Sequence, residues 1–372
     1  MAPVAHLTSA HPPFDTRIFV KELSSLAASG RKACLIACHT HDETKNGVNI
    51  ISIPRPSGRM TRMLVTPLKV LWKALRSGAM IVHFHDPELI PIGFVLKAAG
   101  CRIIYDVHED LPRQIGSKEW LPPYVRKPAS VLSEAAEWLA GRAFDGIVAA
   151  TPDIANRFPK HKTLVVQNFP IADELLATGA KPYAERPNII TYIGGISRER
   201  GAVEMIDAME YLNEANPSQQ SQTHLELAGP FFVGGFEQEL AARSGWSKAR
   251  YLGVLDRDGV RDAMSRGRVG LVLLHPTASY LRSYPVKLFE YMAAGIPVIA
   301  SDFPLWRSIV EEAGAGLLVD PRSPRKVAEA IKWILENEAE AEAMGRRGRE
   351  AVLTRYNWAV EERKLLEFYD RF

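Results

Sequence analysis

The stretch SYPVKLFEYMAAGIPVIAS, residues 283–301, places a helix, a glycine stop and a strand in close succession. Pro285 suits the first position of a helix, Gly295 suits its end, and IPVIA reads as a short buried strand. At about 100° per residue one side of this helix is apolar, and Lys287, Glu290 and Tyr291 fall together on the other side. Lys287 and Glu290 are either a solvated surface pair or a binding site beside a helix N-terminus that favours anions.

Short apolar runs recur along the rest of the chain, with helical segments between them. They are KACLIAC, MIVHF, CRIIYDV, DGIVAA and TLVVQN in the first half, and NIITYIGG, HLELAG, ARYLGV, VGLVLL, IPVIAS and GLLVD in the second. This alternation predicts parallel sheets with helices on both faces. A chain of 372 residues exceeds the usual size of one core, so we expect two α/β domains, joined through the linker-like residues 179–188.

The composition narrows the classes of partner and compartment. With 47% hydrophobic and 24% charged residues the chain should be globular, and a formal net charge of +3 gives no argument for a nucleic-acid partner. The three cysteines form neither a metal-ligand pattern nor a disulfide framework, which favours a reducing compartment. The first residues lack the apolar core of a secretory signal, and no apolar run approaches the roughly 20 residues of a membrane-spanning helix. We therefore expect a cytoplasmic protein.

Ligands of open parallel sheets bind beyond the carboxyl ends of the strands, so the residues after each predicted strand are the candidate site residues. In the first half these are His85 and Asp86, followed by His108 and Glu109. In the second half the glycine pair of YIGGISRERG, residues 192–201, lets backbone amides approach an anion that two arginines can neutralise. The spacing matches neither GxGxxG nor the phosphate loop GxxxxGK[ST], and the alternative is a tight turn before a solvated helix start.

Together with HFHDPELIPIG, YDVHED and the opening HPPFDTRIFVKELSSLAASG, these segments resemble retaining glycosyltransferases of family 4, from about residue 6 to residue 360. The resemblance implies an α/β protein of the GT-B fold, with two Rossmann-like parallel-sheet domains facing a central cleft. It implies an acceptor-binding domain at 1–180, a nucleotide-sugar-binding domain at 181–352, and a C-terminal helix within 353–372 that packs back on the first domain.

The resemblance also implies the roles of individual residues. The donor would be bound by Gly194, Gly195, Arg198, Arg200, Gly229, Leu255, Arg282, Ser283, Lys287, Leu288 and Glu290, with Glu290 on the ribose and Arg198, Arg200 and Lys287 toward the diphosphate. The acceptor would be bound by Asp15, Arg17, His85, Asp86, His108 and Glu109. His108, Arg200 and Lys287 are the expected catalytic residues, and neither a metal nor a cofactor is expected.

The chain departs from the family pattern at two positions. Arg282 stands eight positions before Glu290, where many members have a glutamate, and Gly195 stands where many have arginine. We interpret both as signs of a variant donor pocket. The acidic triplet DRD at 256–258 is interpreted as a solvated loop rather than as a metal site.

The sequence therefore predicts transfer of a sugar, with retention, from a uridine or guanosine diphosphate sugar to the hydroxyl group of a sugar, a lipid-linked glycan or a small molecule. Such a reaction belongs to the synthesis of bacterial glycans, polysaccharides or glycoconjugates. The alternatives are a nucleotide-sugar 2-epimerase of the same fold and a nucleotide-sugar-binding protein without turnover.

Residues 59–78, RMTRMLVTPLKVLWKALRSG, interleave five cations with apolar residues and contain no acidic residue. Such a basic amphipathic segment can lie on anionic lipid at the inner face of a membrane. The alternative is an ordinary surface helix that packs its apolar side on the N-terminal sheet.

Overall fold

The computed structural model describes residues 1–117, 122–175, 181–215 and 223–372. Contacts divide the chain into two compact units. The N-terminal unit comprises Met1–Asn168 and Trp358–Phe372, and the C-terminal unit comprises Phe169–Asn357. The boundary expected from the sequence, at residue 180, lies outside the described residues. Phe169 and Leu175 pack into the core of the C-terminal unit, which is why that unit begins before the expected boundary.

Within the described residues, the N-terminal unit has an eight-stranded sheet in the order β3-β4-β2-β1-β5-β6-β7-β8. Every neighbouring pair is parallel except the hairpin pair β3 and β4. The strands are β1 (Val4–Leu7), β2 (Ala33–Cys38), β3 (Glu43–Lys45), β4 (Val48–Ile53), β5 (Ile81–Phe84), β6 (Arg102–Val107), β7 (Gly146–Ala149) and β8 (Thr163–Val165). Strands β1, β3 and β4 were not predicted from the sequence, because the run VAHL is short and the β3–β4 hairpin carries many polar residues.

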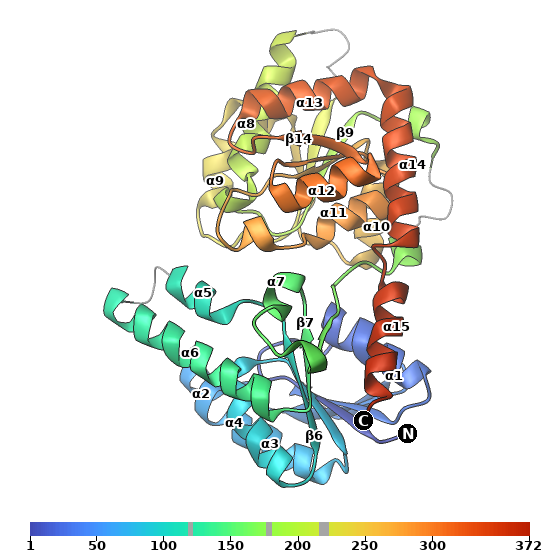
Figure 1. Ribbon diagram of the computed structural model, residues 1–372. Coiled ribbons are helices and arrows are strands. Elements are labelled where there is room, and N and C mark those ends of the chain that lie inside the picture. The colour runs from blue at the N-terminus through green and yellow to red at the C-terminus, as the bar shows by residue number, and fades with distance from the viewer. Residues whose placement is uncertain (118–121, 176–180, 216–222) are drawn as a thin grey trace. The chain divides into compact units, whose positions relative to one another are not determined.

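Both faces of this sheet are covered, as expected for parallel strands. Leu35 of β2 packs in a core with Ile18 and Phe19, whereas its neighbour Ile36 faces a second core with Val70 and Leu96. The longer helical segments are Thr16–Leu23, α1 (Ser24–Ala28), α2 (Arg59–Leu64), α3 (Thr66–Arg76), α4 (Ile90–Ala98), α5 (Leu111–Ser117), α6 (Pro123–Ala143), α7 (Pro152–Ala155) and α15 (Trp358–Tyr369). Figure 1 shows α2, α3, α4 and α6 gathered on one face of the sheet.

The last helix, α15, is held to the N-terminal unit by polar contacts as well as by packing. The indole Nε1 of Trp358 donates to Ser25 Oγ over 3.0 Å, and Glu361 accepts from the backbone amide of Gln167 over 3.0 Å. The buried Tyr369 hydroxyl lies 2.6 Å from Nδ1 of His83. These contacts join the end of the chain to β5 and to the segment that follows β8.

In the described part of the C-terminal unit, six strands form an entirely parallel sheet in the order β11-β10-β9-β12-β13-β14. The strands are β9 (Ile189–Ile193), β10 (His224–Ala228), β11 (Ala249–Tyr251), β12 (Val269–Val272), β13 (Val298–Ser301) and β14 (Gly316–Val319). The helices are α8 (Ala202–Ala215), α9 (Phe236–Ala241), α10 (Arg257–Arg266), α11 (Val286–Ala293), α12 (Pro304–Ala313), α13 (Pro324–Glu336) and α14 (Glu338–Thr354). Leu271 and Val272 of β12 face different cores, so this sheet too is covered on both faces.

Two parallel-dominated sheets with helices between the strands confirm the predicted α/β fold class. Over the ranges that the structure describes, no helix combines the length and the apolar character needed to cross a bilayer.

Candidate functional site

The glycine loop of the C-terminal unit, residues 194–201, lies at the carboxyl end of β9, between β10 and β12. Its backbone is tied to the neighbouring strand, because the amide of Gly194 donates to the carbonyl of Ala228 over 2.8 Å. The amide of Ile196 donates in the same way to Pro230 over 2.9 Å. Gly229 therefore lies beside Gly194, and both belong to the expected donor-binding set.

Two buried tyrosines hold the start of this loop. The Tyr192 hydroxyl donates to the carbonyl of Gly195 over 2.7 Å, and the Tyr291 hydroxyl accepts from the amide of Ile193 over 2.8 Å. Helical periodicity predicts Tyr291 on the polar side of α11, but its side chain is fully buried beneath β12 at Gly270. The role of both tyrosines was not predicted, because helical and strand periodicity cannot show that a hydroxyl group will form a hydrogen bond with a distant loop.

Lys287 lies in the first turn of α11, and its ammonium group is buried against the glycine loop. A Cβ atom built on Gly194 would lie 2.9 Å from Lys287 Nζ, and φ of Gly194 is 141°, so this position requires glycine. Among the described residues Nζ has no hydrogen-bond partner, and it lies 3.9 Å from the centroid of the Tyr192 ring. Burial, together with the charge of Arg200, lowers the pKa of Lys287 to about 7. A buried ammonium without an acceptor indicates a place for an anion.

The two arginines of the loop have different surroundings. Nη1 of Arg200 would lie 3.9 Å from a Cβ built on Gly194, so Arg200 and Lys287 converge on the same glycine. Arg198 instead pairs with Glu239 of α9, and 61% of its side chain is exposed. Arg200 is therefore the loop arginine that the structure brings to Lys287.

The other expected donor residues are spread along α11 and the loops before α10 and α11. Glu290 is half-buried one turn after Lys287, and its charge raises the pKa of that lysine against the effect of burial. Leu288 is fully buried in the hydrophobic core, so its side chain is directed away from any ligand. Arg282 is exposed, and Ser283 is half-buried with its carbonyl accepting from the Trp306 indole over 2.8 Å.

The loops that follow β10 and β11 hold two further residues beside the expected donor-binding set. A Cβ atom on Gly195 would collide with the ring of Phe232, so this ring takes the space that a side chain at position 195 would fill. Leu255 is half-buried beside Asp256, which caps α10 by accepting from the amide of Gly259 over 2.8 Å. The capping role gives the first aspartate of the DRD triplet a structural function.

In the N-terminal unit, His108 follows β6 and is oriented by a buried carboxylate. Its Nε2 lies 2.8 Å from Asp106 Oδ2, and 18% of its side chain is exposed. Asp106 also accepts from Nε and Nη2 of Arg17, over 3.0 and 2.9 Å. Burial alone would raise the pKa of Asp106, but Arg17, His108 and His85 together hold it well below its usual range. Asp106 is thus a permanent anion behind His108.

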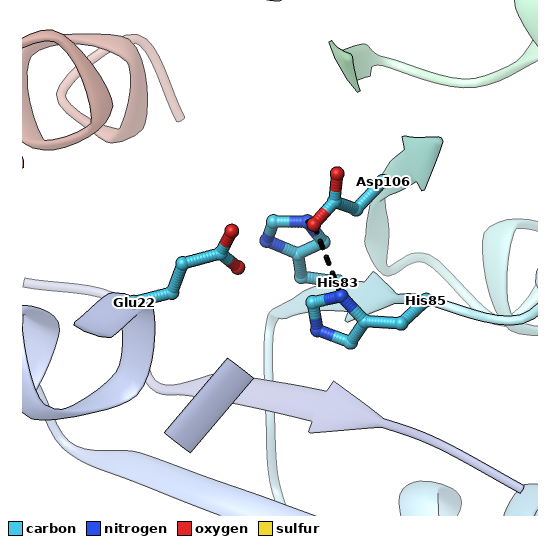
Figure 2. A group of neighbouring side chains, drawn as sticks. All are labelled: Glu22, His83, His85 and Asp106. Carbon is cyan, nitrogen blue, oxygen red and sulfur yellow. Dashed lines mark hydrogen bonds and ion pairs between the residues drawn. The ribbon is translucent and has the colours of Figure 1, made fainter. Parts of the chain in front are cut away.

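Behind His108 lies the cluster in Figure 2, formed by Glu22, His83, His85 and Asp106, whose potential ligand atoms lie within 4.8 Å of one another. Such a set could hold a metal ion. However, Arg17 lies 3.0 Å from Glu22 and 2.9 Å from Asp106, and therefore already supplies a buried cation. Burial and the charge of Asp106 raise the pKa of Glu22 well above its usual range, which leaves one anion paired with one guanidinium. We therefore assign this cluster a positioning role.

A chain of hydrogen bonds continues from this cluster to α15. His85 lies 3.2 Å from His108 and 2.9 Å from His6, and His6 lies 3.0 Å from the Tyr369 hydroxyl. Burial lowers the pKa of His85 to about 4, and that of His6 well below its usual range, so both rings are neutral at pH 7. The neutral chain fixes the orientation of His85, and His85 supports His108 from behind.

Three of the expected acceptor residues are occupied by contacts within the unit. The guanidinium of Arg17 pairs with Glu22 and Asp106, and its Nη1 donates to the carbonyl of Val166 over 2.7 Å. Asp86 accepts from the Thr8 hydroxyl and the Ser9 amide, each over 2.7 Å. Asp15 caps the helical segment Thr16–Leu23, so these residues shape the loops rather than offer free polar groups. His108 and the exposed Glu109 remain the accessible members of the set.

Asp86 also contacts a residue that the sequence analysis did not name. Nδ1 of His11 lies 3.0 Å from Asp86 Oδ1, and this carboxylate raises the pKa of His11 even though burial acts to lower it. His11 lies in the loop after β1, and its ring lies 5.1 Å from that of His108. Recognising residues 4–7 as a strand would have predicted this contact. A strand there places the following SAH segment at the same sheet edge as His85 and His108.

The two units match known glycosyltransferase families. Residues 18–168 match the description "Glycosyltransferase Family 4", and residues 179–351 match "Glycosyl transferases group 1". The phosphatidyl-myo-inositol mannosyltransferase of Mycobacterium leprae is 32% identical over 138 residues, which are 37% of this chain and 36% of that protein. The aligned region thus spans about a third of this relative.

Solved structures resemble the whole chain. Sucrose-phosphate synthase from Thermosynechococcus elongatus has a TM-score of 0.75 at 19% identity, covering 100% of this chain and 99% of that one. The Anabaena protein HepE, in complex with UDP-glucose, has a TM-score of 0.73 at 12% identity, with 100% of both chains covered. At these identities the likeness shows the fold alone.

Proposed function

Because this chain belongs to glycosyltransferase family 4 and has the GT-B fold, we propose that it transfers a sugar from a nucleoside diphosphate sugar to an acceptor hydroxyl, with retention at the anomeric carbon. The C-terminal unit binds the donor in this proposal, and the N-terminal unit binds the acceptor. A relative from Mycobacterium tuberculosis, 37% identical over 83 residues, is named as a GDP-mannose-dependent mannosyltransferase, and HepE has been solved with UDP-glucose, so guanosine and uridine donors are both candidates.

The observation that carries this proposal is the buried ammonium of Lys287 at Gly194. It has no hydrogen-bond partner in the described part of the chain, and Arg200 brings a second cation to the same glycine. Two cations beside the half-buried backbone of Gly194 suit the diphosphate of a donor sugar. Negative charge grows on this diphosphate as its bond to the sugar breaks, so the same two groups would also stabilise the transition state.

Glu290 completes the donor site in this proposal. A carboxylate can accept hydrogen bonds from both hydroxyl groups of a ribose, and Glu290 stands one turn beyond Lys287 on α11. Arg282 and the Phe232 ring over Gly195 would then distinguish the pocket of this chain from that of relatives with glutamate and arginine at positions 282 and 195.

The family resemblance supports a transfer in which the acceptor oxygen approaches the anomeric carbon from the side that the diphosphate leaves. The bond from this carbon to the diphosphate oxygen breaks, the bond to the acceptor oxygen forms, and the acceptor proton passes to the departing diphosphate. In the N-terminal unit His108 would orient the acceptor, because Asp106 holds its ring in place while part of it stays exposed. The acceptor is a sugar, a lipid-linked glycan or a small molecule.

The first experiment is a thermal-shift screen of uridine and guanosine diphosphate sugars, since a ligand stabilises the state that it binds. The best donor is then incubated with and without acceptor hydroxyl compounds, and the anomeric configuration of the product is read by proton NMR. Release of nucleoside diphosphate with a product of unchanged anomeric configuration supports the proposal. Epimerised donor would indicate an isomerase, binding without release would indicate a protein without turnover, and an inverted product would refute retention.

A further inference from the structure

Helix α3 has two apolar faces, and only one of them packs on the sheet. Val70 and Ala74 are buried and face the core of the N-terminal unit. Leu68, Trp72 and Leu75 form a second stripe at helical spacing, and these side chains are 63%, 51% and 53% exposed. The sequence left open whether the apolar residues of this segment pack on the sheet. The structure shows that one set does, and that the other set points to solvent.

Exposed apolar side chains also occur on helices near α3. In α2, Met60 and Met63 are 68% and 53% exposed. Helix α4 contacts both α3 and α6, and Figure 1 shows these helices on one face of the unit. In α6, Leu132 and Trp138 are 72% and 52% exposed. Soluble monomers rarely expose apolar residues over several neighbouring helices unless the face binds something.

Cations run alongside the stripe on α3. Lys69, Lys73 and Arg76 follow Leu68, Trp72 and Leu75 by one residue each, which forms a parallel basic stripe. Among the described residues none of these three has a carboxylate within ion-pair distance, whereas Arg62 of α2 pairs with Glu88 over 3.1 Å. The guanidinium of Arg76 lies 3.8 Å from the centroid of the Trp72 ring. The charge of this face is therefore largely uncompensated within the protein.

A groove beside α3 joins the two kinds of residue. It has a volume of about 430 Å³ and is lined by Ile53, Pro54, Val65, Leu68, Trp72 and the stems of Lys69 and Lys73. Its walls are mostly apolar, and two of its lining residues are lysines. This arrangement suits an amphipathic ligand with an apolar chain and an anionic head.

We propose that this face, defined by Met60, Met63, Leu68, Trp72 and Leu75 with Lys69, Lys73 and Arg76, docks on a bilayer that contains anionic lipid. Interfacial helices combine a wide apolar face with flanking cations, and an anionic bilayer surface is complementary to both. The run of residues 59–76 without an acidic side chain favours such a surface over a protein partner of mixed charge. The proposal goes beyond the proposed transfer reaction and does not depend on it, because lipid binding needs neither donor nor turnover.

The test uses the whole chain and sedimentation with vesicles of pure phosphatidylcholine or of phosphatidylcholine with phosphatidylglycerol, at low salt and at 0.15 M salt. We expect binding to the anionic vesicles, weakened by salt, because screening shortens the range of charge attraction to about 8 Å at 0.15 M. Lys69→Gln/Lys73→Gln should weaken this binding by roughly 30-fold, since each cation contributes about fivefold. Leu68→Ala/Trp72→Ala should weaken it tenfold or more at both salt concentrations.

The matched control is Lys326→Gln/Lys332→Gln on α13, which removes the same charge from the exposed surface of the C-terminal unit. It should bind vesicles as the unchanged protein does. Leu68, Lys69 and Trp72 are exposed and Lys73 is half-buried, so we expect both α3 variants to fold, and unchanged melting temperatures would establish this.

Three results would overturn the proposal. The first is no binding of the unchanged protein to anionic vesicles at low salt. The second is an equal loss in the α13 control, which would assign binding to net charge alone. The third is a dimer in sedimentation velocity that Leu68→Ala/Trp72→Ala dissociates, which would assign the face to a second copy of the chain.

Discussion

The ammonium of Lys287 lies 3.9 Å above the ring of Tyr192 and finds no hydrogen-bond acceptor among the described residues. Tyr192 in turn donates to the carbonyl of Gly195, so one aromatic side chain supports both the lysine and the glycine loop. The ligand-free protein thus keeps a buried cation that is poorly compensated. Such an arrangement costs stability, and we expect an anionic ligand to recover this cost.

Lys287→Met should stabilise the ligand-free protein by roughly 1–3 kcal/mol at pH 6 and by less at pH 9, because it removes a buried ammonium that no described residue pairs with. The pKa of Lys287 is lowered from its ordinary value of 10.5 to about 7, so the unfolded chain holds this proton more firmly than the folded one. The stability cost of the lysine therefore grows as the pH falls from 10.5 and is complete below pH 7. Chemical denaturation at both pH values measures it. If Lys287→Met destabilises the protein at pH 6, the buried ammonium of Lys287 does not lower its stability.

Binding of a nucleoside diphosphate sugar should take up about one proton at pH 8.5 and almost none at pH 6, because the diphosphate favours the charged form of Lys287. The diphosphate of such a donor stays ionised throughout, so it does not contribute protons itself. Calorimetry in buffers of different ionisation enthalpy counts the protons, and the Lys287→Met variant supplies the background. The same uptake in that variant would show that another group titrates.

Arg200→Ala should lower kcat/KM by roughly 100-fold, because the guanidinium would face charge that grows in the transition state. Arg198→Ala is the matched control and should lower it by less than about fivefold, since Arg198 is largely exposed and pairs with Glu239. Steady-state kinetics measure kcat/KM of both variants. Equal losses in the two would mean that the loop rearranges around the donor.

Glu290→Gln should weaken nucleotide binding by roughly 10- to 100-fold and leave the melting temperature of the ligand-free protein nearly unchanged, because it removes a charge-assisted acceptor without changing volume. Titration calorimetry with the preferred nucleoside diphosphate measures the affinity. Glu329→Gln on α13 serves as the control, since Glu329 is an exposed residue that pairs with Lys326 on the same helix. Unchanged affinity in Glu290→Gln would remove the ribose assignment.

His108→Ala should lower kcat for transfer by roughly 100-fold while the affinity for the donor stays within about twofold, because His108 belongs to the N-terminal unit. His161→Ala, at an exposed histidine of the same unit, should leave both quantities unchanged. Transfer assays and donor titrations separate the two effects. A loss of donor affinity equal to the loss of kcat would place His108 outside the acceptor side.

Part of the architecture could be predicted because it follows from local geometry. Periods of about 3.6 and 2 residues are properties of a single helix or strand, so the alternation of elements, the glycine loop at residue 194 and the spacing of Lys287 and Glu290 were readable from the sequence. The α/β fold class followed from this alternation, the family from the resemblance of the quoted motifs, and both are confirmed. The strands that were not predicted, β1, β3 and β4, are short or mixed in polarity and show little periodicity.

The partners of individual polar groups could not be predicted, because they come from distant parts of the chain. Arg17 and Asp106 meet only because β1, β5 and β6 are neighbours in the sheet, and this strand order is not written in any local pattern. In the same way, tertiary packing pairs Arg198 with Glu239 and places Lys287 at Gly194, where no described residue offers its ammonium an acceptor. The sequence by itself determined which residues carry charge at the ends of strands. The tertiary structure decided which of these charges are already paired and which remain for a ligand, because pairing depends on distances across the sheet.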